Sequence, residues 1–232
     1  MITDEEFAIL GGMSLGPGTQ EYENWTRELE KASAELAGSL SVSLQSLFLV
    51  RPVSTELSEE EVARLTPDQK LKFSKIIDPT RKKEWSESRR CHWLLGNFRF
   101  KSLSHSKADG KSDSAHIVLA WGLNDPSEMV QGVGIDVELR SRVISDATAE
   151  RFSSLDERKL GVSGLELWTA KEAAFKANPR NDDTVVVQYK ILNRDADGMG
   201  RVRGPQGEEI RIKSLALGPW QVSLALQIAR AH

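Results

Sequence analysis

The sequence predicts an α+β protein whose sheets are mostly antiparallel. Residues 220–228 alternate large apolar residues with smaller or polar ones, which is the periodicity of a β-strand with one buried face. Shortly before this run, Val202 and residues 210–212 flank the Gly-Pro-Gln-Gly turn at 204–207, as the two arms of a hairpin do. Strands joined by tight turns pair antiparallel, and helical patterns elsewhere in the chain supply the α component.

The chain opens with a predicted helix and a predicted strand. Residues 18–37 are rich in Glu, Lys and Ala, and Trp25, Leu29 and Ala32 recur on one helical stripe. This pattern indicates an amphipathic helix. The short apolar run at 44–50 is closed by Arg-Pro and favours a strand over a helix.

A basic helix is predicted next. Residues 58–61 (Ser-Glu-Glu-Glu) have the pattern of a capping box and open a helix. From Asp78 to about Leu95 the chain is highly charged, and its proline stands in the first turn, where a helix tolerates it best. This stretch is the one basic helix that the sequence predicts, and its cations are Arg81, Lys82, Lys83, Arg89 and Arg90.

The remaining elements are two strands, a helix and a further strand. Residues 116–121 and 130–139 are apolar runs that indicate buried strands. A helix is predicted near 165–177, and the β-branched run at 184–192 favours a strand. Together with the hairpin and the last strand, these elements complete the predicted α+β fold.

The length of 232 residues allows one large domain or two halves. The turn residues at 124–127 are the natural boundary. They divide the chain into an N-terminal half, 1–125, with the additional N-terminal helix and the basic helix, and a C-terminal half, 126–232.

Composition excludes several classes of protein. The 31 Lys and Arg residues against 34 Asp and Glu residues give a net charge of −3, which argues against a protein that coats nucleic acid. Cys91 is the single cysteine, so neither an internal disulfide nor a cysteine-based zinc site is possible. No apolar run approaches the ~20 residues of a membrane span, and the acidic start lacks the features of a secretory signal. We therefore expect a cytoplasmic protein with neither nucleic acid nor membrane among its partners.

Two pairs of charged residues are candidates for chemistry. Asp136 and Glu138 lie two apart in a predicted strand and project from the same face. Glu172 and Lys176 lie one helical turn apart in the predicted helix. Taken alone, the first pair is more often the acidic outer face of an edge strand, and the second is often an exposed ion pair.

Taken together, the two pairs fit phosphoryl transfer. Mg²⁺ prefers oxygen ligands and is usually held by a few carboxylates and by substrate phosphates, and Asp136, Glu138 and Glu172 supply such a set. A carboxylate beside the metal can take a proton from an attacking hydroxyl, and a lysine can neutralise the charge on a departing phosphate. Glu172 and Lys176 are the catalytic candidates.

The order and separation of these motifs resemble a known family. Residues 134–138 (Gly-Ile-Asp-Val-Glu), followed by 168–172 (Trp-Thr-Ala-Lys-Glu) and Lys176, are similar to the paired signature of the 4′-phosphopantetheinyl transferases. A third mark of that family, a Ser-His pair ahead of a strand, resembles Ser104-His105. The length points to the larger, pseudo-dimeric type that activates surfactin synthetase and similar enzymes. The resemblance implies two pseudo-symmetric halves, each a mostly antiparallel sheet packed with helices.

The resemblance also implies an activity: transfer of the phosphopantetheine arm of coenzyme A to a serine of an acyl- or peptidyl-carrier protein, with release of adenosine 3′,5′-bisphosphate. It implies that the protein is a monomer and that Glu172 acts as base while Lys176 assists the leaving phosphate. The implied Mg²⁺ ligands are Asp136, Glu138 and Glu172. The implied coenzyme contacts are Lys82, Lys83, Arg89, Ser104, His105 and Lys171, with His105 at the 3′-phosphate.

Two other functions are compatible with the same residues. One is another Mg²⁺-dependent enzyme, a hydrolase or nucleotidyl transferase, that acts on a different nucleotide. The other is a non-catalytic module that binds coenzyme A or a carrier protein. The short segment 94–101 leaves the second alternative open, because it bridges a connection that is longer in the family, and Arg99 or Lys101 would have to replace the missing contacts.

Overall fold

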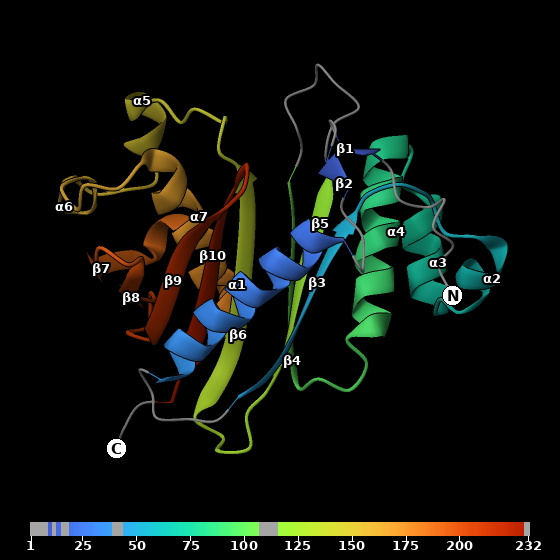
Figure 1. Cartoon of the computed structure of the whole chain (residues 1–232), viewed down its shortest axis with the longest axis horizontal. Helices are drawn as coiled ribbons and strands as arrows, with labels where there is room; N and C mark the ends of the chain where they lie inside the picture. Colours follow the sequence, from blue (N-terminus) through green and yellow to red (C-terminus); the bar gives the residue numbers. More distant parts are fainter. Residues whose placement is uncertain (1–8, 11–12, 15–18, 39–43, 107–115, 230–232) are drawn as a thin grey trace.

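Two antiparallel sheets, of three and five strands, form the framework of this α+β chain, as predicted (Figure 1). The structure is a computed structural model and describes residues 9–10, 13–14, 19–38, 44–106 and 116–229. The two sheets stand side by side, and helices cover their outer faces (Figure 1).

The three-stranded sheet has the order β3 (Gln45–Pro52), β5 (Ile117–Asn124), β4 (Phe100–Ser106). The basic helix α4 (Pro79–Leu94) packs on it through a small cluster that includes Cys91 and Val118. Asp78 caps α4, and the proline stands at its first position, so the helix begins where the sequence predicts. Two short helices, α2 (Glu59–Ala63) and α3 (Pro67–Ser74), precede it, and each begins with a capping box. The one at Ser58 confirms the prediction.

The five-stranded sheet has the order β6 (Val130–Leu139), β10 (Trp220–Ile228), β9 (Glu209–Leu217), β8 (Met199–Arg203), β7 (Lys190–Arg194). Helix α7 (Gly164–Ala177) covers one face of β6 and β10. The smaller elements are β1 (Ile9–Leu10), β2 (Met13–Ser14), α5 (Asp146–Ala149), α6 (Leu155–Arg158) and two 3-10 turns, Asn181–Asp183 and Val186–Gln188. Among the described helices, none is both long and apolar enough to cross a membrane.

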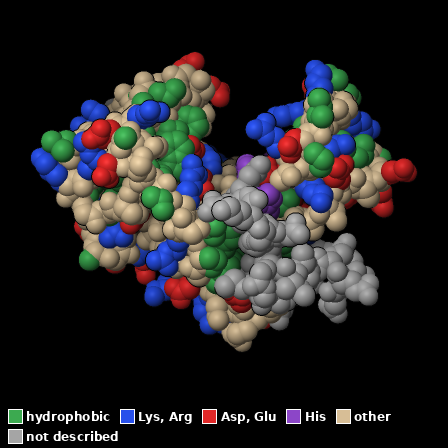
Figure 2. Space-filling model, turned by 90° about the horizontal axis from the view of Figure 1, so that it is seen from above, with side chains coloured by type: hydrophobic (Ala, Val, Ile, Leu, Met, Phe, Trp, Pro, Cys, Tyr) green, Lys and Arg blue, Asp and Glu red, His purple; other side chains and the backbone are tan. Residues whose placement is uncertain are grey.

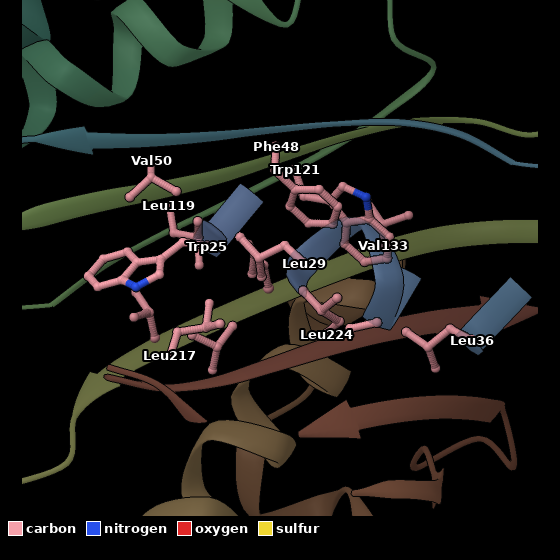
Figure 3. Packing of buried hydrophobic residues seen from close by; sticks show 14 of the residues in the cluster. Trp25, Leu29, Leu36, Phe48, Val50, Leu119, Trp121, Val133, Leu217 and Leu224 are labelled. Carbon is pink, nitrogen blue, oxygen red and sulfur yellow. The ribbon is translucent and has the colours of Figure 1, made fainter. Parts of the chain in front are cut away.

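Helix α1 (Gln20–Gly38) joins the two sheets (Figure 3). Trp25, Leu29 and Ala32 form the buried stripe that the sequence predicts, and Leu36 extends it. They lie in one hydrophobic cluster with residues of both sheets. Members from the three-stranded sheet include Phe48 and Trp121, whose rings stack 5.4 Å apart, and members from the other sheet include Leu217 and Leu224. Residues before and after the turn at 124–127 therefore share one core. The boundary between halves at this turn stays a prediction.

Two details of the predicted elements were wrong. Strand β10 is buried on both faces rather than one, because α1 covers Leu224 while Ala225 packs in the cluster under α7. The run at 184–192 forms a strand only from Lys190 onward. Before it, Val185 is exposed and its carbonyl accepts a bond from the Gln188 amide at 2.9 Å, so the chain turns locally instead of pairing.

The single cysteine is inert. The Cys91 thiol is fully buried between α4 and the three-stranded sheet. Burial, with a smaller contribution from Glu87, raises its pKa to about 12. The thiol is therefore protonated and out of reach of solvent.

Gly134 sets the distance between β6 and α7. A Cβ at this position would lie 1.8 Å from the Ala173 carbonyl oxygen and 2.7 Å from the Ala177 amide nitrogen. Both are backbone atoms and cannot be moved by a rotamer change. We expect Gly134→Ala to lower the free energy of unfolding by about 3 kcal/mol, because α7 must shift away from the strand.

Urea unfolding of Gly134→Ala and Gly38→Ala tests this prediction. Gly38 is a matched control, because an added Cβ there meets nothing within 4 Å. Its substitution should change stability by less than about 1 kcal/mol. Equal midpoints for the two variants would contradict the close approach.

Candidate functional site

Serine side chains join the two sheets where β4 lies beside β6. Within the described residues these strands belong to different sheets and do not pair through their backbones. Alternate residues of β4 are serines, and each hydroxyl accepts a hydrogen bond from an alternate backbone amide of β6. We call these three residues the serine ladder: Ser102 bonds Ile135 at 2.9 Å, Ser104 bonds Val137 at 3.3 Å, and Ser106 bonds Leu139 at 3.1 Å.

Asp136 and Lys176 meet beside the serine ladder. The Lys176 ammonium, from α7, donates to the Asp136 Oδ1 at 2.8 Å, to the Ile135 carbonyl at 3.1 Å and to the Ser104 hydroxyl at 3.1 Å. The Asp136 carboxylate is buried, and its Oδ2 has no hydrogen-bond partner among the described residues. The close contact of β6 and α7 at Gly134 is what allows the lysine to reach this carboxylate.

Glu138 lies two residues further along the same face of β6, as predicted. It is partly exposed and forms an ion pair with Arg142, a residue that the sequence reasoning missed. The Ser106 hydroxyl lies 3.4 Å from its other oxygen. The signal for Arg142 was its position four residues after Glu138, just beyond the strand.

Glu172 is the third carboxylate. It lies on α7 one turn before Lys176 and is partly buried. Burial raises its pKa above the ordinary value of a glutamate; Lys176 opposes this effect, while the negative charges of Asp136 and Glu138 add to it. The structure therefore brings all four predicted residues into electrostatic reach of one another.

The donor set fits a hard cation. No group of three or more His, Cys, Asp or Glu side chains within the described parts of the chain is gathered into a ready-made metal cluster. Asp136 and Glu138 are instead each paired with a cationic side chain. Three features nevertheless suit Mg²⁺: oxygen donors, an unpartnered buried oxygen on Asp136, and a Glu172 whose charged form a nearby cation would stabilise.

A groove runs along α4 toward the predicted Ser-His pair. It has a volume of about 820 Å³, and it is lined both by His105 of β4 and by residues of the first turns of α4. Figure 2 shows the molecule hollowed between α2–α4 on the right and the C-terminal sheet on the left, with Lys and Arg side chains beside the hollow. The lining residues are Lys75, Ile76, Ile77, Asp78, Arg81, Glu84, Trp85, Ser88 and His105. The His105 ring is half-exposed and lies 3.6 Å from Glu84.

Arg89 is not part of the lining of this groove, but it contacts Trp85, which is. Its guanidinium stacks on the Trp85 ring at 5.2 Å, and its Nε is buried with no hydrogen-bond partner among the described residues. Burial lowers its pKa, so the cation is held in a poorly solvated position. A guanidinium held in this way favours an anionic partner.

The other basic residues of α4 differ in availability. Lys82 pairs with Glu56 at 3.2 Å and covers the Phe73 ring at 4.7 Å. Lys83 is exposed. Arg90 is structural, because it bonds Glu61 and Glu87, and its hydrogen bond to Glu61 helps to lower the pKa of that carboxyl to about 2. The prediction that Lys82 and Lys83 contact the coenzyme stays a prediction.

Two further predicted coenzyme ligands lie elsewhere. The Ser104 hydroxyl is buried, and its contacts are with Asp136, Val137 and Lys176. Lys171 is only 1% exposed and pairs with Glu157 inside the C-terminal part of the chain. Its ammonium also donates to the Phe152 carbonyl at 2.6 Å. These placements support a role in positioning for Ser104 and a role in stability for Lys171.

Two more residues, in the short segment at the start of the serine ladder, were candidates for replacing the missing contacts with the coenzyme. Arg99 is exposed and stacks beside Phe100 at 5.1 Å. The Lys101 ammonium donates to the Gly96 carbonyl at 2.5 Å. Neither lines the groove at His105.

No protein-family model and no curated protein matches this chain.

Proposed function

We propose that this chain is a Mg²⁺-dependent 4′-phosphopantetheinyl transferase that acts on coenzyme A and a carrier protein. One observation carries the proposal. Lys176 of α7 and Ser104 of β4 both bond Asp136 of β6, with Glu172 one turn away, so segments far apart in the chain converge on one acidic site. A purely structural surface has no need of a buried carboxylate with an unpartnered oxygen.

The chemistry assigns a role to each residue. Mg²⁺, when bound by Asp136, Glu138 and Glu172, would offset the charge of the coenzyme's pyrophosphate. Glu172 would accept the proton of the carrier serine, and burial raises its pKa in the metal-free protein. The serine oxygen forms a bond to the phosphorus beside the pantetheine arm, and the bond from that phosphorus to the bridging oxygen breaks. The electron pair leaves on adenosine 3′,5′-bisphosphate, and Lys176 stabilises this charge.

The groove along α4 is the proposed place for the nucleotide end of coenzyme A. His105 and Arg81 line it, and Arg89, which stacks on the lining residue Trp85, has an unsatisfied donor. The volume lies in the range of pockets that hold cofactors. We assign the 3′-phosphate to His105, in keeping with the resemblance of the Ser-His pair.

The finer description of the fold belongs to the same proposal. The two sheets, with α4 on one and α7 on the other, would be pseudo-symmetric halves, 1–125 and 126–232. Helix α1 would not belong to the repeated unit, and it would hold the two halves together by packing against both sheets. We further propose that the protein is a monomer and works in the cytoplasm.

Release of adenosine 3′,5′-bisphosphate tests the proposal against its alternatives. With coenzyme A and Mg²⁺, we expect release only when an apo carrier protein is added. Release without a carrier would instead indicate a hydrolase. Binding of coenzyme A by calorimetry, with no release for a broad set of acyl and peptidyl carriers, would indicate a binding module.

A further inference from the structure

The Ser104 hydroxyl has every hydrogen-bonding position occupied. It accepts from the Val137 amide at 3.3 Å and from the Lys176 ammonium at 3.1 Å, and it donates to the Asp136 Oδ1 at 2.8 Å. A hydroxyl has one proton to donate and two lone pairs, so these three bonds exhaust its capacity. The group is buried, and no water is needed to satisfy it.

These bonds link a backbone position to the charged pair. The Val137 amide fixes the hydroxyl relative to β6, and the hydroxyl in turn holds the Asp136 Oδ1. Lys176 binds the same oxygen, at 2.8 Å. The carboxylate is therefore held at Oδ1 by both partners, and its second oxygen, Oδ2, is buried without a partner.

We propose that Ser104 is a positioning residue for the metal site: its hydroxyl holds Asp136 and Lys176 so that the Asp136 Oδ2 is presented to the cation. This inference rests on the proposed function, because it assumes that the site binds a divalent ion. It gives Ser104 a different role from a contact with the coenzyme's 3′-phosphate. Hydrogen-bonding partners that orient metal ligands typically contribute 10- to 100-fold in metal affinity.

The serine ladder provides its own control. Ser102 is nearly as buried as Ser104, 6% against 5% exposed, and likewise accepts from a backbone amide of β6. Among the described residues it bonds neither Asp136 nor Lys176. Alanine at either position leaves one β6 amide without its partner, so both variants share that loss. Only Ser104→Ala removes the bonds to the charged pair.

Binding of Mn²⁺ alone, followed by electron paramagnetic resonance of the free ion and by competition with Mg²⁺, separates the two roles. We expect Ser104→Ala to bind Mn²⁺ roughly 10-fold more weakly than the wild type, and Ser102→Ala to bind it as the wild type does. Ser104→Thr keeps the hydroxyl and should restore most of the affinity. If Ser104→Ala does not fold, Ser104→Cys, whose thiol is a much weaker donor and acceptor than the hydroxyl, carries the same expectation.

The outcomes are distinct. Equal Mn²⁺ affinity for Ser104→Ala, Ser102→Ala and the wild type, with equal losses of thermal stability, would show that the ladder only joins the sheets and would overturn the inference. Failure of the folded wild type to bind Mn²⁺ would overturn the metal site itself, and with it the proposed function. A wild type that binds Mn²⁺ but transfers nothing would count against the function alone.

Discussion

Glu172→Gln is expected to reduce phosphopantetheine transfer by about 10³-fold while the protein stays folded. The substitution removes the proposed base and one carboxylate ligand of Mg²⁺, and a general base alone typically contributes 10²- to 10⁴-fold. The side chain keeps its shape, and its partial burial favours an uncharged group at this position. Loss of transfer with a normal unfolding curve is therefore the expected combination.

The same substitution has a pH signature in the metal-free protein. Because the pKa of Glu172 is raised by folding, the folded state binds its proton more tightly than the unfolded state does. Its contribution to stability is fully present below the unfolded pKa and is lost as the pH rises through the folded pKa. The stability of the wild type minus that of Glu172→Gln should thus fall as the pH rises from about 4.3, the ordinary value of a glutamate.

Glu166→Gln is the matched control for activity. Glu166 lies on the same helix, but it pairs with Arg194 rather than with the acidic site. We expect this variant to retain transfer within a few-fold of the wild type. Equal activity of Glu172→Gln and the wild type would remove Glu172 from the chemistry.

Lys171→Ala is expected to lower the free energy of unfolding by about 3–5 kcal/mol, the usual cost of removing one partner of a buried ion pair. The Lys171 ammonium lies 2.9 Å from Glu157, and both side chains are almost fully buried. Glu157 also accepts from the Ile191 amide at 2.9 Å, so its charge cannot turn to solvent when the lysine is lost. Unfolding in urea measures the effect.

Lys159→Ala is the control for that prediction. Lys159 pairs with Asp156 at 3.5 Å, but both side chains are exposed. Its loss should cost less than about 1 kcal/mol. If the two variants unfolded at the same urea concentration, the buried pair would have no special role in stability, and Lys171 would again be a candidate for coenzyme binding.

The fold class and most elements were predictable from local patterns. The alternation in β10, the proline and aspartate at the start of α4 and the capping box at Ser58 each act within a few residues, so sequence alone reveals them. The role of α1 was not predictable, since an apolar stripe does not say what will cover it. The structure places two sheets against that stripe.

The carboxylates of the site were predictable from the sequence, but the residues that hold them in place were not. The shared face of Asp136 and Glu138 follows from strand geometry, and the spacing of Glu172 and Lys176 from helix geometry. The resemblance implies that Lys171 contacts the coenzyme, yet one helical step from Glu172 turns its side chain toward Glu157. The serines at every second position of β4 could be seen in the sequence. Their bonding to β6 depends on how two sheets meet, which local patterns do not fix.

The most direct test of the acidic site as a transferase centre is the intact mass of an apo carrier protein after incubation with coenzyme A, Mg²⁺ and this protein. We expect a carrier to gain the mass of one phosphopantetheinyl group on a single serine. Chelation of the metal or Glu172→Gln should abolish the gain. An unchanged mass for every acyl and peptidyl carrier tried, with folded wild-type protein and excess Mg²⁺, would contradict the assignment of the acidic site as a transferase centre.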